Sequence, residues 1–306
     1  MTLVLVNSFL KNGINPDPIA TGRPLIPRLI WQTTERREST HPKILECMED
    51  LIAMNPDWDH KLFDARERHK FLESVCSDRF MRAFERIQPA YGAARADMFR
   101  YVIVYLHGGV YMDIKAGTTR PLACILMPDD QFVISQWDNG PDGQFPGTGI
   151  RKELRSIPGG EFEQWFTIAA PGHPILAAVI EQVIENVENY SPFKFGHGAE
   201  GVLDVFGPNA YSKVVHRTKN LHPHRKICAW EQGLQATMLK NLDSHTALDK
   251  SHYSRVQKAP VTANGLDPID RFKYWLAEIL AWIVYAPKRL NRMRLRRLRA
   301  RNARLQ

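Results

Sequence analysis

The sequence predicts an α/β fold, and two observations carry this prediction. Segments typical of strands alternate with segments typical of helices from residue 25 onward, which is the order that gives a sheet covered by helices. The 306 residues, of which 44% are hydrophobic and 24% are charged, describe an ordinary globular chain that is long enough to bury a core. We therefore expect one large α/β domain with short flanking segments.

The first predicted elements follow a β-α-β order. Leu25–Trp31 predicts a strand, and a helix is expected to open near Pro42, because proline is tolerated in the first turn of a helix. Trp58–Phe63 predicts the next strand, and Glu67–Val75 predicts a second helix. A further element is expected around Phe80–Ile87. This order is the main support for the α/β class.

The stretch from Ala94 to Gly117 is the most informative part of the chain. It begins as an apolar helix on which Asp97 and Arg100, three residues apart, leave from the same side. Gly108-Gly109 is expected to end the helix, because glycine takes the positive φ that a helix end requires. A short strand then ends at Asp113. The pattern predicts a phosphate and metal site at the edge of a sheet.

The second half of the chain continues the alternation of elements. We expect strands at Phe132–Ser135 and Phe162–Ala170, helices at Ile175–Val187 and Tyr211–Arg217, and loops at Trp137–Gly160 and Pro192–Gly201. Residues 1–24 are rich in Asn, Pro and Gly and are expected to form a poorly fixed lead-in, so the domain is placed at residues 25–260. The four cysteines form no CxxC pair, which is typical of reduced thiols rather than of disulfides or a zinc site.

Residues 261–306 form a separate C-terminal segment with an amphipathic and basic character. Asp270–Ala286 is helical in pattern and strongly apolar, with Trp275 and Trp282 seven residues apart. Beyond Pro287 come Lys288 and eight arginines and no acidic residue; removing these nine cations from the 41 leaves 32 basic residues against 33 acidic ones. The net charge of +8 therefore belongs to the tail, and the body is close to neutral.

Three interpretations are compatible with this segment. Aromatic rings followed by arginines are typical of a helix that lies on an anionic membrane surface, and this is the preferred interpretation. The alternatives are a helix packed on the domain with a free basic end, and a nucleic-acid-binding tail, which the near-neutral body disfavours. No signal peptide and no stretch long enough to span a bilayer is found. We expect a cytoplasmic protein that is peripheral on the membrane.

Several separated segments together resemble glycosyltransferase family 32, whose sugar-binding region carries a DxD motif. They are IPRLIWQT at 26–33, NPDWDHKLFD at 55–64 and ARADMFRYVIVYLHGGVYMDIKAG at 94–117, with APGHP at 170–174 and FGPNAYSKVV at 206–215. The family includes yeast initiating α-1,6-mannosyltransferase-like proteins and bacterial capsular or lipopolysaccharide enzymes. The resemblance implies a GT-A-like (Rossmann-related) fold, a UDP- or GDP-sugar donor and transfer with retention of configuration.

The resemblance also implies roles for single residues. Asp97 and Arg100 would contact the sugar and the phosphate of the donor, and Tyr111 would line the nucleotide site. Asp113 would be the first carboxylate of the DxD motif, placed to bind ribose or metal. Trp31 or Gln32 would lie near the base. Without the family, the pair on the helix reads as an exposed ion pair, and the two aromatic residues read as core.

The motif departs from the family at its second carboxylate, where this chain has Lys115. Lysine cannot ligate Mg²⁺ or Mn²⁺. A divalent cation would then be held by Asp113 with other groups, of which His252 is the first candidate; alternatively, Lys115 and Arg100 neutralise the diphosphate without a metal. The first hypothesis is a retaining hexosyltransferase that acts on a glycan or lipid-linked acceptor, in surface polysaccharide synthesis. The alternative is a catalytically inactive sugar-nucleotide or glycan-binding scaffold at the membrane.

Overall fold

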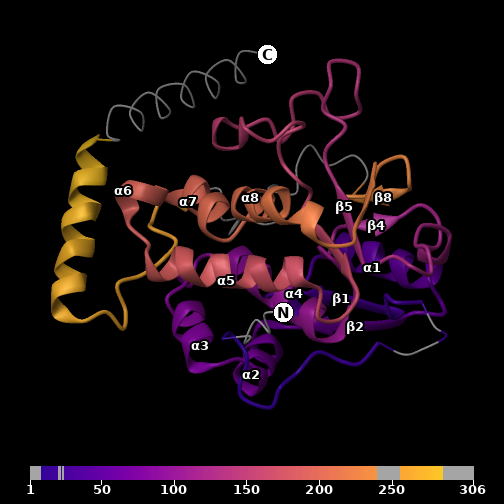
Figure 1. The fold of residues 1–306 in the computed structure, drawn as a ribbon, viewed down its shortest axis with the longest axis horizontal. Coiled ribbons are helices and arrows are strands. Elements are labelled where there is room, and N and C mark those ends of the chain that lie inside the picture. The colour runs from indigo at the N-terminus through magenta and orange to yellow at the C-terminus, as the bar shows by residue number, and fades with distance from the viewer. Residues whose placement is uncertain (1–7, 20–21, 23, 240–255, 285–306) are drawn as a thin grey trace.

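A mixed six-stranded sheet forms the centre of the protein (Figure 1). In the computed structural model, which describes residues 8–19, 22, 24–239 and 256–284, its order is β2-β1-β3-β6-β5-β7. The strands are β1 Leu29–Thr33, β2 Asp59–Phe63, β3 Gly109–Met112, β5 Phe132–Ser135, β6 Phe166–Ala169 and β7 Arg225–Ile227. β1 runs parallel to β2 and β3, and β5 to β7, whereas β6 is antiparallel to both of its neighbours. The predicted α/β class is confirmed.

Helices cover the sheet, and a small second sheet lies beside it. The helices are α1 Pro42–Met54, α2 Ala65–Val75, α3 Asp78–Glu85, α4 Gly92–His107, α5 Pro174–Glu188, α6 Pro192–Phe195, α7 Gly198–Val205 and α8 Pro208–Thr218. The second sheet pairs β4 Gly117–Thr118 with β8 Leu234–Gln235. Alternate residues of a strand point to opposite faces. Ile30 and Val110 therefore join the core on the α1 side, while Trp31 and Tyr111 join the core around α4.

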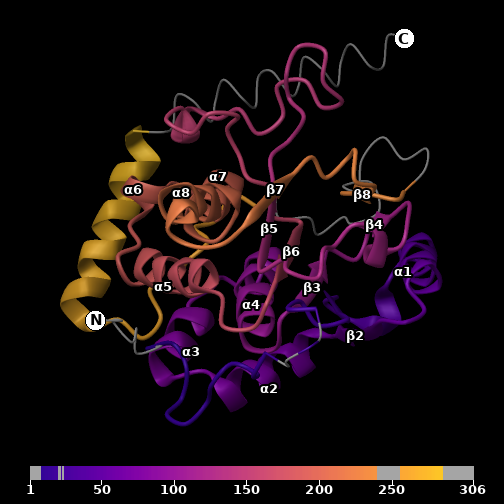
Figure 2. The ribbon, with the colours of Figure 1, turned by 45° about the vertical axis from the view of Figure 1, so that its right-hand side comes forward.

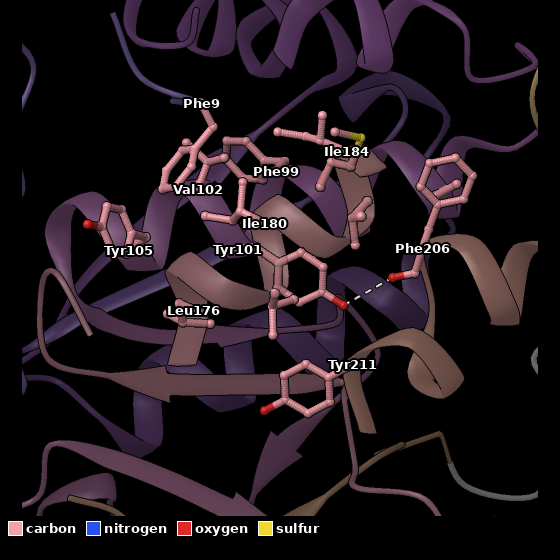
Figure 3. Close-up of a cluster of buried hydrophobic side chains, with 14 of the residues drawn as sticks. Phe9, Phe99, Tyr101, Val102, Tyr105, Leu176, Ile180, Ile184, Phe206 and Tyr211 are labelled. Atoms are coloured by element: carbon pink, nitrogen blue, oxygen red, sulfur yellow. Dashed lines mark hydrogen bonds between the residues drawn. The ribbon is translucent and has the colours of Figure 1, made fainter. Parts of the chain in front are cut away.

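The central helix α4 is buried between the sheet and α5 (Figure 3). Phe99, Tyr101 and Val102 are each fully shielded from solvent, and every residue from Asp97 to Leu106 is buried. The Tyr101 hydroxyl donates a hydrogen bond of 3.1 Å to the carbonyl oxygen of Phe206. A rigid, buried α4 fixes the positions of the polar side chains that it carries.

Two glycines let α4 turn directly into β3, as the sequence predicts. Gly108 caps the helix at φ +65°, and Gly109 opens the strand at φ +94°. A Cβ on Gly108 would lie 2.7 Å from Pro171 Cδ, and one on Gly109 would lie 2.6 Å from the carbonyl oxygen of Leu29. Both the backbone conformation and the close approach of β1 therefore require glycine here.

Three sequence predictions differ from the structure. The first strand runs over Leu29–Thr33 and so begins after Pro27, which has no N–H to donate to a ladder. The predicted loop at 192–201 contains α6 and the first half of α7. Gly201 lies inside α7, where a Cβ would come within 2.8 Å of the Gly196 carbonyl oxygen and 2.9 Å of Pro260. In the lead-in, Phe9 and Leu10 are buried in the core.

A helix over residues 268–284 follows the domain, in agreement with the pattern of the C-terminal segment. Figures 1 and 2 show it in yellow beside α6, at the end of the molecule away from β4 and β8. Tyr274 and Ala281 face the body, and the Tyr274 hydroxyl donates to the carbonyl oxygen of Val261 at 2.8 Å. Among the described residues, no helix is long and apolar enough to cross a membrane.

Candidate functional site

The predicted pair on α4 is buried rather than exposed. Asp97 and Arg100 keep 6% and 5% of their surface, and Arg100 Nη2 lies 2.9 Å from Asp97 Oδ1. The same nitrogen lies 3.0 Å from Oδ1 of Asp113 at the end of β3. Arg100 Nη1 also donates to the carbonyl oxygen of Gln164. One guanidinium therefore joins α4, the end of β3 and the segment before β6, and the interpretation as an exposed ion pair is wrong.

The charges of this network do not balance, because one guanidinium faces two carboxylates. Burial raises the pKa of Asp97 to about 7; Arg100 opposes this rise, and the negative charge of Asp113 adds to it. The pKa of Arg100 is raised, since Tyr111 and the two carboxylates outweigh the effect of burial. Asp113 keeps 31% of its side-chain surface. It is thus the member of the network that a ligand can reach.

The end of β3 is held in a fixed geometry around Asp113. Its N–H donates to the carbonyl oxygen of Trp165 at 2.9 Å, and its own carbonyl oxygen accepts from the N–H of Ala116 at 2.8 Å. The side chain of Tyr111, two residues earlier, is 1% exposed and lies beneath the Arg100 guanidinium, 4.6 Å from ring centroid to Cζ. A cation–π contact stabilises a cation more strongly where water is excluded, so the Tyr111 ring stabilises the buried Arg100 guanidinium.

Gln32 and Trp31, which were predicted near the base, lie in different places. Gln32 is fully buried, and its Nε2 donates to the Asp113 carbonyl oxygen at 3.3 Å while its Oε1 lies 2.8 Å from His60 Nε2. Trp31 points to the other face of the sheet, where its Nε1 donates to the carbonyl oxygen of Gly108 at 2.8 Å. Gln32 thus supports the turn at Asp113, and Trp31 stabilises the junction of α4 and β3.

Lys115 lies in the turn that follows Asp113, half-buried. Its carbonyl oxygen accepts from the N–H of Met238 at 2.8 Å, so its backbone is fixed. Burial lowers the pKa of its ammonium, and Asp113 opposes this shift. His252, the predicted partner for a metal, lies outside the described residues. Within the part of the chain that the structure describes, no three His, Cys, Asp or Glu side chains are grouped so that they would hold a metal ion.

The segment before β6 also contributes to the site, and the sequence prediction did not include it. The Gln164 amide donates to the Tyr101 hydroxyl, and its backbone carbonyl accepts from Arg100. Glu163 is 4% exposed and accepts from Trp165 Nε1 at 2.9 Å; burial raises the pKa of its carboxyl. The only signal in the sequence is a group of polar residues inside an apolar strand pattern, and that signal does not reveal the partner of Arg100.

The site lies in a part of the chain that is similar to a known protein family. Residues 42–133 match the "Glycosyltransferase sugar-binding region containing DXD motif". The chain is 24% identical over 213 residues to an "Initiation-specific alpha-1,6-mannosyltransferase" of Schizosaccharomyces pombe, covering 62% of this chain and 48% of that protein. It is 28% identical over 172 residues to the "Putative glycosyltransferase HOC1" of Saccharomyces cerevisiae, covering 52% and 39%. The chain thus spans less than half of these relatives.

Two further similarities are shorter or weaker. The chain is 31% identical over 122 residues to the "Mannosyl phosphorylinositol ceramide synthase SUR1" of Saccharomyces cerevisiae, over 39% of this chain and 30% of that protein. The solved "PaToxG Glycosyltransferase" superposes with a TM-score of 0.47 at 13% identity, over 63% of this chain and 69% of that one. Asp97, Arg100, Tyr111, Asp113 and Lys115 all lie inside the matched region. The resemblance to glycosyltransferase family 32 is therefore confirmed for the region over residues 42–133.

Proposed function

We propose that this protein is a retaining glycosyltransferase that moves a hexose from a UDP- or GDP-sugar to a glycan or lipid-linked acceptor, in surface polysaccharide synthesis. The observation that carries the proposal is the buried network of Asp97, Arg100 and Asp113 at the end of β3. It lies in the region that matches the sugar-binding model, and two relatives are named as an alpha-1,6-mannosyltransferase and a putative glycosyltransferase. The geometry suits recognition of a polar donor at the edge of a sheet.

The different burial of Asp113 and Arg100 indicates different roles for the two residues. Asp113 is the partly exposed carboxylate and would accept hydrogen bonds from hydroxyl groups of the donor. Arg100 is enclosed by Asp97, Tyr111 and the Gln164 carbonyl, so it positions Asp113. A site held on a rigid helix and a strand end loses little free energy to reorganisation when charge develops on the leaving phosphate.

A screen for hydrolysis of UDP- and GDP-sugars without acceptor tests the proposal. We expect one donor to release its nucleoside diphosphate, and we expect Asp113→Asn to lower this rate by roughly 100-fold, in the range seen when one preorganised polar contact to a transition state is lost. Asp57→Asn is the matched control, because its side chain is 80% exposed and lies far along the chain from the site. If no donor is hydrolysed and none binds, the proposal is wrong.

A second function rests on Lys115. The replacement of a DXD carboxylate by lysine also fits a protein that binds a sugar nucleotide or glycan but does not transfer the sugar. The same screen separates the two: binding of a donor by calorimetry without release of nucleoside diphosphate, with and without an acceptor extract, supports the binding protein.

We further propose that the helix over residues 268–284 brings the protein to the cytoplasmic face of an anionic membrane. Its outward face carries large apolar side chains that are 47–68% exposed: Ile269, Phe272, Trp275, Leu276, Ile279, Leu280, Trp282, Ile283 and Val284. Single exposed apolar residues are common, but a continuous face of this kind marks an interaction surface. The eight arginines and Lys288 that follow in the sequence select anionic lipid as the partner, since each basic residue near such a surface adds about 1 kcal/mol.

Sedimentation with liposomes tests this part of the proposal. The wild type is expected to bind vesicles with phosphatidylserine or phosphatidylglycerol and to bind pure phosphatidylcholine weakly. The triple change Phe272→Ser, Trp275→Ser and Ile279→Ser, on side chains that are 68%, 54% and 58% exposed, should release the protein, and truncation after Ala286 should do so as well. Ile150→Ser, at 59% exposure on another surface, is the control. Dimerisation without vesicle binding would instead assign the face to a second copy of the chain.

A further inference from the structure

The turn after β3 holds a lysine where a DXD motif holds its second carboxylate. The backbones of Asp113 and Lys115 are fixed relative to each other, because the Ala116 N–H donates to the Asp113 carbonyl oxygen and the Met238 N–H donates to the Lys115 carbonyl oxygen. The ammonium and the carboxylate therefore occupy the two motif positions. The presence of an ammonium beside a carboxylate, in place of two carboxylates, determines whether the site favours a cationic or an anionic ligand.

A divalent cation does not fit the groups that the structure describes here. Mg²⁺ requires near-octahedral oxygen coordination, and protein sites usually supply it with more than one carboxylate. Among the described residues of the site, Asp97 is buried and paired with Arg100, and the partly exposed carboxylate of Asp113 already contacts Arg100 at 3.0 Å. A cation would also lie close to two protein cations, Arg100 and Lys115, which repel it. The protein groups present here are those expected of an anion-binding site.

Of these two cations, Lys115 is the one whose charge is available to a ligand. The Arg100 side chain keeps only 6% of its surface, and its guanidinium is shared between Asp97 and Asp113 at 2.9 and 3.0 Å. Lys115 is half-buried, and its ammonium makes no hydrogen bond or ion pair with another described residue. A flexible ammonium with three donors suits phosphate oxygens as a point charge.

We propose that the Lys115 ammonium takes the place of the divalent cation and binds the diphosphate of the sugar nucleotide directly, so that this protein binds its donor without a metal. The proposal rests on the proposed function and names how the same site holds the diphosphate. In the transfer, the bond between the anomeric carbon and the phosphate oxygen breaks with both electrons going to the diphosphate. The acceptor oxygen forms the new bond, and its proton goes to the leaving diphosphate, while Lys115 remains an ammonium throughout.

Calorimetry with UDP and with GDP, each in EDTA and in Mn²⁺, tests the inference. For the nucleotide that binds, the wild type is expected to show the same Kd within about twofold in both solutions. Lys115→Ala should weaken binding about tenfold in both, the effect of losing one charge-assisted contact to phosphate. Lys115→Asp restores two carboxylates and should make binding weak in EDTA and stronger in Mn²⁺. Lys152→Ala is the control, since its side chain is 73% exposed.

The outcomes separate this inference from the function on which it rests. If the wild type binds a nucleotide in Mn²⁺ and loses it in EDTA, the metal-free site is wrong and the glycosyltransferase stands. If Lys115→Ala binds as tightly as the wild type, the lysine does not contact the diphosphate, and the inference fails. If neither nucleotide binds under either condition, both proposals are wrong. The comparison of the wild type in the two solutions needs no variant and so does not depend on how a substitution folds.

Discussion

Arg100 Nη2 lies 3.0 Å from the Asp113 carboxylate, although the two residues belong to different elements, α4 and the end of β3. This contact links the interior of the protein to the only carboxylate of the network that keeps appreciable exposure. Arg100 is in turn fixed by Asp97, by the Tyr111 ring and by the Gln164 carbonyl. The orientation of Asp113 therefore depends on groups that are buried in the protein.

The first prediction follows from this dependence. Arg100→Ala leaves Asp97 buried without its cation, and removing one partner of a buried ion pair costs about 3–5 kcal/mol. We expect a loss of this size in the free energy of unfolding, measured with urea. Arg28→Ala, on a side chain that is 54% exposed and 3.8 Å from Asp57, should change the stability by less than about 1 kcal/mol. Equal effects of the two substitutions would contradict the role of Arg100 as the centre of the network.

Much of the fold could be predicted because local patterns agree with it. The unit of helix, Gly-Gly and strand could be predicted, because the apolar pattern of α4 and the glycines that take a positive φ at its end are local features of the sequence. The helix α7 was not predicted, because its Gly201 was interpreted as a loop residue. Gly201 instead allows close packing against Pro260, and a contact between residues so far apart cannot be predicted from a local pattern.

The candidate site could be predicted in part for the same reason. Asp97, Arg100 and Asp113 are close in the sequence, and the structure brings them together. The partner that lies far along the chain, Gln164, could not be found, because its contact is made by a backbone carbonyl that every residue type carries. Trp31 lies on the face opposite to Gln32, since neighbouring residues of a strand point to opposite sides.

The second prediction concerns the junction of α4 and β3. Gly109→Ala would force a Cβ to within 2.6 Å of the Leu29 carbonyl oxygen at a backbone φ of +94°, so we expect the free energy of unfolding to fall by more than about 1 kcal/mol. Gly140→Ala is the matched control, because its Cβ would meet nothing within 4 Å. Denaturation by urea should shift the midpoint for the first variant and leave it nearly unchanged for the second. If Gly109→Ala is as stable as the wild type, the close contact of β1 and β3 is wrong.

The third prediction concerns pH and His173, which caps α5. Its Nδ1 accepts from the N–H of Ile175 at 3.3 Å and its Nε2 donates to the Pro223 carbonyl oxygen at 3.0 Å, which is the pattern of a neutral ring.

Burial lowers the pKa of His173 to about 4, below its ordinary value of 6.5. The folded state therefore binds the proton less tightly than the unfolded state, and the stability that this group contributes is present above pH 6.5 and is lost as the pH falls toward 4. His173→Asn keeps an N-cap acceptor but does not titrate, so the wild type should lose more stability than this variant between pH 7 and pH 5, measured by urea denaturation at each pH. His41→Asn, at the exposed N-cap of α1, controls for the loss of a capping histidine as such. Parallel pH profiles for the wild type and His173→Asn would show that His173 is not neutral and buried in the folded protein.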